Sequence, residues 1–299
     1  MGVTMKDIKE LRSRTGAGVL DCKKALNEVD GDVEAAVEYL REKGMSDAAK
    51  KAGRIAAEGL VSLKITDDRK KGVLVEVNSE TDFVAKNDQF KTLVSDITEH
   101  LLASEAEDVE KIGEEKWIKD ESKTVNSVIK EAIAGIGENI NLRRFDRYNT
   151  DGFLYGYIHL GGKIGVIVDF ADDFSADKEQ TAKDIAMHIA AINPEFLDRD
   201  SVSQENLEKE KKIYKEQMLN EGKPEHIIDQ IVEGKINKYY TQVCLLEQPF
   251  VRDDEKTVAD VLKENDMEIN SFTRFEIGEG IEKKEEDFAA EVEAAAKNQ

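Results

Sequence analysis

The sequence has few of the residues on which metal sites and nucleophilic catalysis depend. Its 299 residues include two cysteines, four histidines, one tryptophan and three prolines. Cys22 and Cys244 lie far apart and make no CxxC or other metal-ligand spacing, which is typical of a protein from a reducing compartment. The scarcity of proline favours long uninterrupted helices.

The sequence also lacks a membrane segment and a targeting signal. No apolar run approaches the roughly 20 residues that a membrane-spanning helix needs. The first residues, from Met1 to Lys6, contain no apolar signal core, and Lys6 stands where the myristoylation pattern requires Ser or Thr. We therefore expect a cytoplasmic protein.

Positive charge is in deficit. The chain has 43 Lys and Arg against 64 Asp and Glu, which gives a formal net charge of -21. Nucleic-acid phosphates and anionic membrane surfaces would both repel such a chain, so nonspecific binding to either is excluded. A basic patch on a protein partner would instead attract it.

Motifs for phosphate binding and catalysis are missing as well. Gly161-Gly162-Lys163-Ile164 lacks the spacing of a P-loop, and Gly16-Ala17-Gly18 lacks the third glycine of the dinucleotide fingerprint. His100 and His188 lie on predicted helices, where we expect them to pack. For His159, at a predicted strand end before Gly161-Gly162, a functional role remains possible from sequence. We predict no catalytic residue, no metal site and no cofactor.

What the sequence does contain begins with a small helical domain, residues 1–44. Apolar residues recur at helical spacing, and glycine-containing turns at residues 15–18 and 30–32 separate three short helices. The third helix is expected to end at Gly44. Such a domain resembles the ubiquitin-associated type. The Ala- and Lys-rich residues 45–57 are expected to form a linker or connecting helix.

The rest of the chain contains an internal duplication. The first copy spans residues 58–148, and the second spans residues 149–196 and 248–280. Residues 72–77 (GVLVEV) correspond to residues 165–170 (GVIVDF) at an offset of 93. Each copy predicts the order strand, strand, helix, helix, strand. The alternating apolar pattern favours antiparallel sheets, and the element order indicates the α+β class.

The offset between the copies changes along the chain. Residues 96–103 correspond to residues 184–191 at an offset of 88, so the first copy carries five more residues before this helix. The extra length falls across residues 78–87, whose polar composition is typical of a loop and which hold Asp82 and Phe83. A phenylalanine in a loop either packs into its own core or is presented to a partner. An added site and neutral drift both explain the insertion.

The second copy is interrupted by residues 197–247, which predict an antiparallel helical hairpin. The helical pattern breaks at Asn220-Glu221-Gly222-Lys223-Pro224. The predicted apolar seam consists of Leu207, Ile213, Tyr214, Met218, Ile227, Ile231 and Ile236. Its narrow width fits coiled-coil pairing. Residues 281–299, acidic and Ala-rich, predict a C-terminal helical module.

Several motifs, in the same order along essentially the whole chain, resemble those of the bacterial elongation factor Ts family. They are Ile8-Lys9-Glu10-Leu11-Arg12, Thr15-Gly16-Ala17-Gly18-Val19-Leu20-Asp21-Cys22-Lys23-Lys24-Ala25-Leu26, Thr81-Asp82-Phe83-Val84-Ala85-Lys86-Asn87, Ile140-Asn141-Leu142-Arg143-Arg144, Ala186-Met187-His188-Ile189-Ala190-Ala191, Pro194-Glu195-Phe196, Gly222-Lys223-Pro224 and Gln248-Pro249-Phe250. Val19 and Leu20 stand where many members carry methionines, a departure that keeps the position apolar.

This resemblance implies a guanine nucleotide exchange factor for elongation factor Tu in translation elongation, without covalent chemistry. Thr81, Asp82, Phe83 and Val84 would form the exchange loop. Phe83 would wedge between helices of the GTPase and Asp82 would accompany it. The partner's Mg²⁺ and phosphate site would then be disturbed, GDP would leave, and the nucleotide-free GTPase would be stabilised until GTP binds.

The resemblance also implies contacts outside this loop. Arg12, Val19 and Leu20 would dock the three-helix domain on the partner's nucleotide-binding domain, whereas core packing is the alternative use of Val19 and Leu20. His159 would lie near the partner's phosphate loop or its other domains. The helical hairpin would be a dimerisation element, and the terminal helix an accessory contact.

Two other classes of function remain open from sequence. A scaffold or adaptor would share every predicted structural feature. It is separated from an exchange factor by whether loss of Asp82 and Phe83 abolishes GDP release while complex formation persists. An enzyme whose site assembles from distant residues is the other class.

Overall fold

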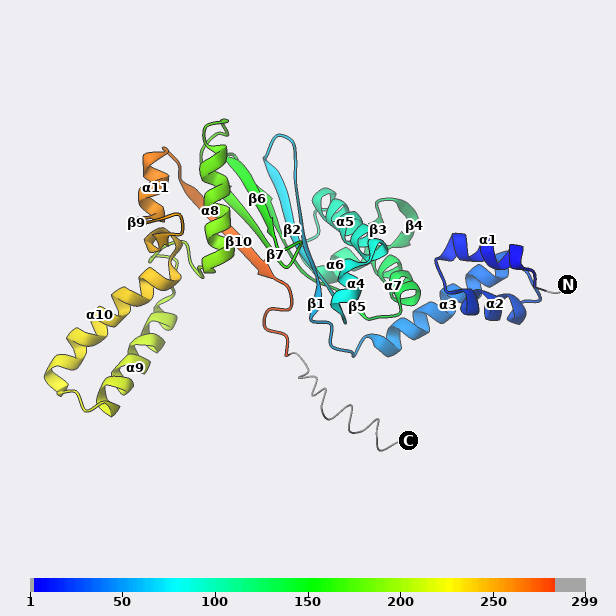
Figure 1. The fold of residues 1–299 in the computed structure, drawn as a ribbon, viewed down its shortest axis with the longest axis horizontal. Helices are drawn as coiled ribbons and strands as arrows, with labels where there is room; N and C mark the ends of the chain where they lie inside the picture. The colour runs from blue at the N-terminus through cyan, green and yellow to red at the C-terminus, as the bar shows by residue number, and fades with distance from the viewer. Residues whose placement is uncertain (1–2, 283–299) are drawn as a thin grey trace. The chain divides into compact units, whose positions relative to one another are not determined.

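The computed structural model describes residues 3–282 (Figure 1) and divides into two compact units. The first contains Met1–Ser62, Val75–Phe145 and Glu276–Gln299, and the second contains Leu63–Leu74 and Asp146–Phe275. Helices and small antiparallel sheets share the chain without one-for-one alternation, so the predicted α+β class is confirmed. The helix predicted near the carboxyl terminus, from residue 283 on, lies outside the described residues.

Three helices form the amino-terminal domain: α1 (Met5–Thr15), α2 (Val19–Glu28) and α3 (Val33–Lys51). Thr4 begins α1 with a capping box, and Gly16 ends it in the left-handed region at φ 69°. The buried core of this domain consists of Ile8, Leu11, Cys22, Ala25, Leu26 and Ala36. The three predicted helices are therefore present.

The expectation that the third helix ends at Gly44 is wrong. α3 continues to Lys51, so the start of the predicted 45–57 linker is helical. Gly44 faces α7 (Val125–Ile136), where an added Cβ would lie 2.8 Å from the Cβ of Ala134. The glycine lets two helices approach closely instead of ending one of them.

The first copy of the duplication contains a three-stranded sheet in the order β1-β2-β5. Its elements are β1 (Glu58–Ile65), β2 (Lys71–Ser79), α4 (Asp82–Lys86), α5 (Asp88–Ala103), α6 (Val109–Glu114), β3 (Lys116–Trp117), β4 (Asp120–Thr124), α7 and β5 (Ile140–Asn149). The predicted order strand, strand, helix, helix, strand is present. The sequence did not predict the short antiparallel ribbon of β3 and β4.

The second copy repeats this plan with a sheet in the order β10-β7-β6. Its elements are β6 (Phe153–His159), β7 (Ile164–Phe170), α8 (Glu179–Ile192), the 3-10 helix η1 (Leu245–Glu247), β8 (Pro249–Phe250), β9 (Asp253–Thr257), α11 (Val258–Glu264) and β10 (Ile269–Glu276). β6 and β7 pair antiparallel along their whole length. A second ribbon, β8 with β9, stands where the first copy has β3 with β4.

Each ribbon is hydrogen-bonded through its turn to a buried histidine. The backbone N–H of Ile118 donates to Nδ1 of His100 at 3.3 Å, and the N–H of Val251 donates to Nδ1 of His188 at 3.2 Å. The ring of His100 also stacks on Trp117. Both histidines are buried at positions that the duplication makes equivalent. The packing role predicted for them is confirmed.

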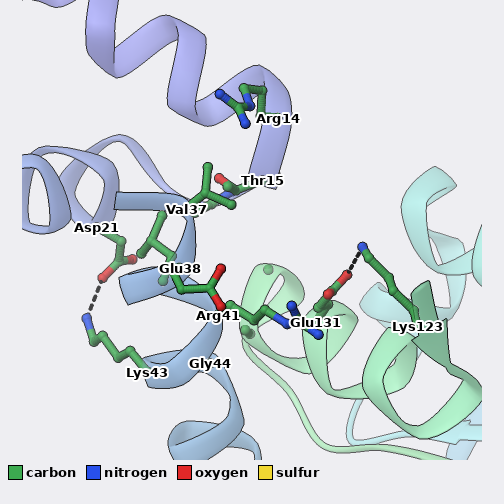
Figure 2. Close-up of a pocket in the computed structure, with 14 residues that line it drawn as sticks. Arg14, Thr15, Asp21, Val37, Glu38, Arg41, Lys43, Gly44, Lys123 and Glu131 are labelled. Carbon is green, nitrogen blue, oxygen red and sulfur yellow. Dashed lines mark hydrogen bonds and ion pairs between the residues drawn. The ribbon is translucent and has the colours of Figure 1, made fainter. Parts of the chain in front are cut away.

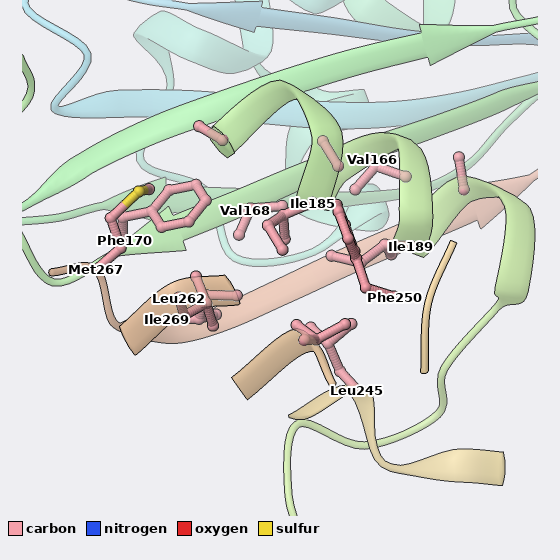
Figure 3. Close-up of a cluster of buried hydrophobic side chains, with 14 of the residues drawn as sticks. Val166, Val168, Phe170, Ile185, Ile189, Leu245, Phe250, Leu262, Met267 and Ile269 are labelled. Atoms are coloured by element: carbon pink, nitrogen blue, oxygen red, sulfur yellow. The ribbon is translucent and has the colours of Figure 1, made fainter. Parts of the chain in front are cut away.

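The core of the second unit lies between its sheet and α8 (Figure 3). Phe153 and Phe170 stack with ring centroids 4.7 Å apart. Ile185 and Ile189 of α8 lie over Val166 and Val168 of β7, and all four are fully buried. This close packing holds β6 and β7 rigidly, and it therefore fixes both ends of the turn that joins them.

The insertion in the second copy forms the predicted antiparallel hairpin, with α9 (Gln204–Asn220) and α10 (Glu225–Val243). The buried seam consists of Met218, Ile228, Val232 and Ile236. Met218 and Ile236 were in the predicted seam, and the predicted Leu207, Tyr214 and Ile231 are partly buried and pack against it. Ile213, which was also predicted there, is 43% exposed and lies outside it.

Candidate functional site

The segment after β2 is a one-turn helix, not the loop predicted for residues 78–87. Helix α4 spans Asp82–Lys86. The hydroxyl of Thr81 begins it by accepting a hydrogen bond from the N–H of Val84 at 3.4 Å. Asn87 ends it and caps α5 in turn. Caps at both ends, Thr81 and Asn87, thus give a polar segment a defined shape.

A carboxylate fixes the start of this helix to the turn before β5. Glu138, in the turn before β5, accepts hydrogen bonds from the backbone N–H of Thr81 at 3.0 Å and from its hydroxyl at 2.7 Å. The neighbouring Glu80 accepts from the N–H of Asn139 at 2.6 Å. Within the helix, the side chain of Val84 is buried. These bonds hold the backbone of α4 in place.

Phe83 points away from the core. Its side chain is 80% exposed, although Val84 beside it is buried. Asp82 and the Nζ of Lys86 form an ion pair at 2.7 Å across one turn, and this Nζ lies 6.0 Å from the centre of the Phe83 ring. Of the two uses that composition left open, the structure excludes the first, because Phe83 is exposed and not packed into its own core.

The side chains of Val19 and Leu20 are also exposed to solvent. They begin α2 after Gly18, and their side chains are 46% and 82% exposed. Neither belongs to the core of the three-helix domain, so the core-packing alternative is excluded. Arg12 on α1 is also exposed. Adjacent exposed apolar side chains are typical of a contact surface.

His159 belongs to the second unit, at the end of β6. Its Nδ1 lies 2.8 Å from the hydroxyl of Tyr157. The next residue, Leu160, is 69% exposed at φ 49°, and Gly161 and Gly162 also have positive φ. A leucine rarely adopts this conformation. Leu160 was not among the predicted site residues, although an apolar residue directly before two glycines at a strand end is a usable signal.

Within residues 3–282, no group of three or more His, Cys, Asp or Glu side chains is placed to hold a metal ion, and none of the helices is both long and apolar enough to cross a membrane. Both cysteines are buried. Burial raises the pKa of the Cys22 thiol, and it raises the pKa of Cys244 to about 11. Thiols that stay protonated at neutral pH are poor nucleophiles.

A cavity of about 240 Å³ lies between the amino-terminal helices and α7 (Figure 2). Its charged groups largely pair with one another. Lys43 reaches Asp21 at 3.1 Å, and Lys123 reaches Glu131 at 2.7 Å. Arg14 at its edge is also ion-paired. Because Arg14, Lys43 and Lys123, three of the four cations that line the cavity, already have partners, it is a weak candidate for an anion site.

The fold and site together define a class of protein. A duplicated α+β core carries a fixed, exposed aromatic side chain, and a small helical domain carries an exposed apolar pair. These are features of a molecule that acts by contact with another protein.

Comparison with known proteins identifies the family. The family model for elongation factor TS matches residues 80–279. The curated protein named Elongation factor Ts from Halothermothrix orenii is 68% identical over 292 residues, covering 98% of this chain and 98% of its own length. Its namesake from Clostridium perfringens is 52% identical over 298 residues, with 97% and 98% coverage. The chain belongs to the elongation factor Ts family.

Proposed function

We propose that the protein is a cytoplasmic guanine nucleotide exchange factor for elongation factor Tu. Family membership supports this activity. The observation that carries the mechanism is the 80% exposure of Phe83 on a helix whose backbone is anchored. A rigidly displayed aromatic loses little conformational freedom when it enters a partner, which favours binding.

Exchange needs no covalent chemistry. GDP is held in a GTPase by contacts to its base, its phosphates and Mg²⁺. A factor that binds the empty GTPase more tightly than the loaded one must weaken nucleotide binding by the same ratio, because the two equilibria are linked. The protein therefore promotes GDP release and stabilises the nucleotide-free form until GTP binds.

The contact residues divide this work. Phe83 wedges between helices of the GTPase, and Thr81 and Val84 hold the turn that carries it. Asp82 brings a carboxylate close to a site built for Mg²⁺ and phosphate. This charge competes for the cation and repels the phosphates, which destabilises the GDP-bound state.

Further contacts come from outside α4. Arg12, Val19 and Leu20 dock the three-helix domain on the nucleotide-binding domain of the GTPase. His159, with the exposed Leu160 beside it, contacts the partner's other domains or its phosphate loop. The α9–α10 hairpin is the dimerisation element.

Release of fluorescent GDP from elongation factor Tu, with and without this protein, tests the proposal. We expect Phe83→Ala to slow release by about 30-fold, because truncating a buried aromatic anchor costs about 2 kcal/mol. Its melting temperature should stay unchanged, since the side chain is exposed. No acceleration by the wild-type protein would overturn the proposal.

Phe174→Ala is the matched control, because Phe174 is the phenylalanine of the corresponding segment in the second copy. The centre of its ring lies 4.1 Å from the guanidinium carbon of Arg69, and the ring packs edge-on against Phe153. We expect this variant to lose about 1 kcal/mol of stability and to keep its exchange rate. If Phe83→Ala lost stability and activity together, Phe83 would be a packing residue.

An adaptor differs from an exchange factor in one measurable way. A double variant of Asp82→Ala and Phe83→Ala that still binds elongation factor Tu but no longer releases GDP supports exchange. If the double variant releases GDP as fast as the wild type does, the segment only tethers the partner.

A further inference from the structure

The first unit contains a second, larger cavity that the proposed function does not use. Its volume is about 450 Å³, and it forms a groove between the end of α3, helices α6 and α7 and the start of β5. The residues that line this α3–α7 groove are Ala48, Ala49, Ala52, Arg54, Ile55, Ala56, Val109, Gly113, Asn126, Ile129, Lys130, Ile133, Asn139, Ile140, Asn141, Leu142 and Ile281.

The lining of the groove is mostly apolar, and its charged residues are basic. Alanine, isoleucine, leucine and valine side chains form most of its wall, and Ile55 at its edge is 45% exposed. Arg54 and Lys130 are its charged residues, and none of the lining residues is Asp or Glu. Arg54 is ion-paired with Glu80 at 3.4 Å, so Lys130 is the cation that the groove offers to an acidic segment. The chain as a whole has 64 Asp and Glu against 43 Lys and Arg. A groove of this kind suits a segment that is both apolar and acidic.

The chain itself leads such a segment to the groove. Ile281 lines the groove, and the described residues end at Glu282. The backbone just before Ile281 is fixed, because the N–H of Gly278 donates to the buried carboxylate of Glu76 at 2.9 Å. Of residues 285–293, five are Asp or Glu and none is Lys or Arg. The same stretch contains Phe288 and, four positions later, Val292.

We propose that residues 285–296 bind in the α3–α7 groove of their own chain. Phe288 and Val292 fill the apolar cavity, and the flanking carboxylates face Lys130. A segment tethered at the groove edge has an effective concentration in the millimolar range, so an intrinsic Kd of about 0.1 mM gives about tenfold more bound than free segment. The proposal is independent of the exchange activity.

Thiol labelling at the groove tests it. Cys22 and Cys244 are fully buried, so a cysteine placed by Ile55→Cys is the accessible thiol among the described residues. We expect this thiol to react about tenfold more slowly in the full chain than in a chain truncated after Glu282. A synthetic peptide of residues 283–299, added to the truncated chain, should restore protection, which mere unfolding of the truncated chain would not allow.

Matched variants separate this contact from other effects. Phe288→Ser should release the protection in the full chain, and Lys130→Glu should weaken it more than Lys9→Glu, which lies outside the groove. A reporter thiol at Ile213→Cys on the hairpin should not respond to truncation. Equal labelling of the full and truncated chains overturns the proposal. Protection that rises with protein concentration also overturns it, because the occupant is then a second copy.

Discussion

The imidazole of His188 is held in a single tautomer. The N–H of Val251 can only donate, so Nδ1 accepts this bond and the ring proton lies on Nε2, which donates to the side-chain oxygen of Gln248 at 2.9 Å. The ring is fully buried and stacks on Phe250. Burial lowers the pKa of His188, since a second proton would place a charge in the core.

We therefore expect stability to fall in mild acid. In the unfolded chain His188 titrates near pH 6.5, whereas in the folded chain its pKa is lower. Between these two values the unfolded state binds more protons, so the free energy of unfolding decreases by up to about 1.4 kcal/mol per pH unit as pH falls. Urea unfolding followed by circular dichroism at about pH 7.5 and about pH 5.5 measures this slope.

Two variants assign the slope to this residue. His188→Gln should lose that part of the pH dependence, besides being less stable. His226→Gln, at an exposed position, should keep it. An unchanged slope in His188→Gln would mean that another group titrates.

At the scale of the element, Gly44 sets the packing of α3 on α7. Alanine normally stabilises a helix interior by about 1 kcal/mol relative to glycine. In α3 the added Cβ would lie 2.8 Å from the Cβ of Ala134, closer than van der Waals contact allows. We expect Gly44→Ala to lower the free energy of unfolding by about 1 kcal/mol, because overpacking outweighs helix propensity. Chemical denaturation followed by circular dichroism measures it.

Gly234→Ala supplies the control for helix propensity. Gly234 lies inside α10, and nothing stands within 4 Å of an added Cβ there. This variant should be more stable than the wild type by up to about 1 kcal/mol. If Gly44→Ala is stabilised to the same extent, α3 and α7 do not approach as closely as the structure has them.

The two copies use corresponding segments in opposite ways. In the first copy, α4 presents Phe83 to solvent. In the second, residues 171–178 form no helix, and Phe174 packs against Arg69 and Phe153. The five extra residues of the first copy gave it room for a capped helical turn.

The sequence predicted those elements whose signal is local. Apolar runs and helical spacing revealed the duplication and the hairpin. The ribbons were missed because β3 has two residues and the residues of β4 are all polar, so neither shows an alternating pattern. Helix α4 was missed because it depends on Glu138, 57 positions along the chain from Thr81. Residue type drew attention to Phe83, and the family resemblance implied a role for Leu20, but only the packing of the whole domain shows that both are exposed.

At the scale of the whole molecule, a buried carboxylate joins distant parts of the first unit. Glu76 of β2 is fully buried and accepts hydrogen bonds from Arg143 at 2.8 Å, from Arg144 at 2.5 Å and from the N–H of Gly278 at 2.9 Å. Gly278 lies so close to Ala57 that a Cβ would meet its carbonyl oxygen at 2.2 Å. Burial alone would raise the pKa of Glu76, but these hydrogen bonds together lower it.

Glu76→Gln should therefore lower the free energy of unfolding of the first unit by about 3 kcal/mol at neutral pH, because it leaves two arginines without their buried counter-charge. Fluorescence of Trp117, buried in the same unit, reports this unfolding.

The stability that the Glu76 carboxylate contributes to the wild type is fully present above about pH 4.5, the ordinary pKa of the group. It is lost as pH falls through the lower pKa that Glu76 has in the folded protein. Glu76→Gln should lack this acid-dependent loss, whereas Glu34→Gln, which removes an exposed pair with Arg14, should behave like the wild type. Identical acid unfolding of Glu76→Gln and wild type would show that the carboxylate does not join these segments.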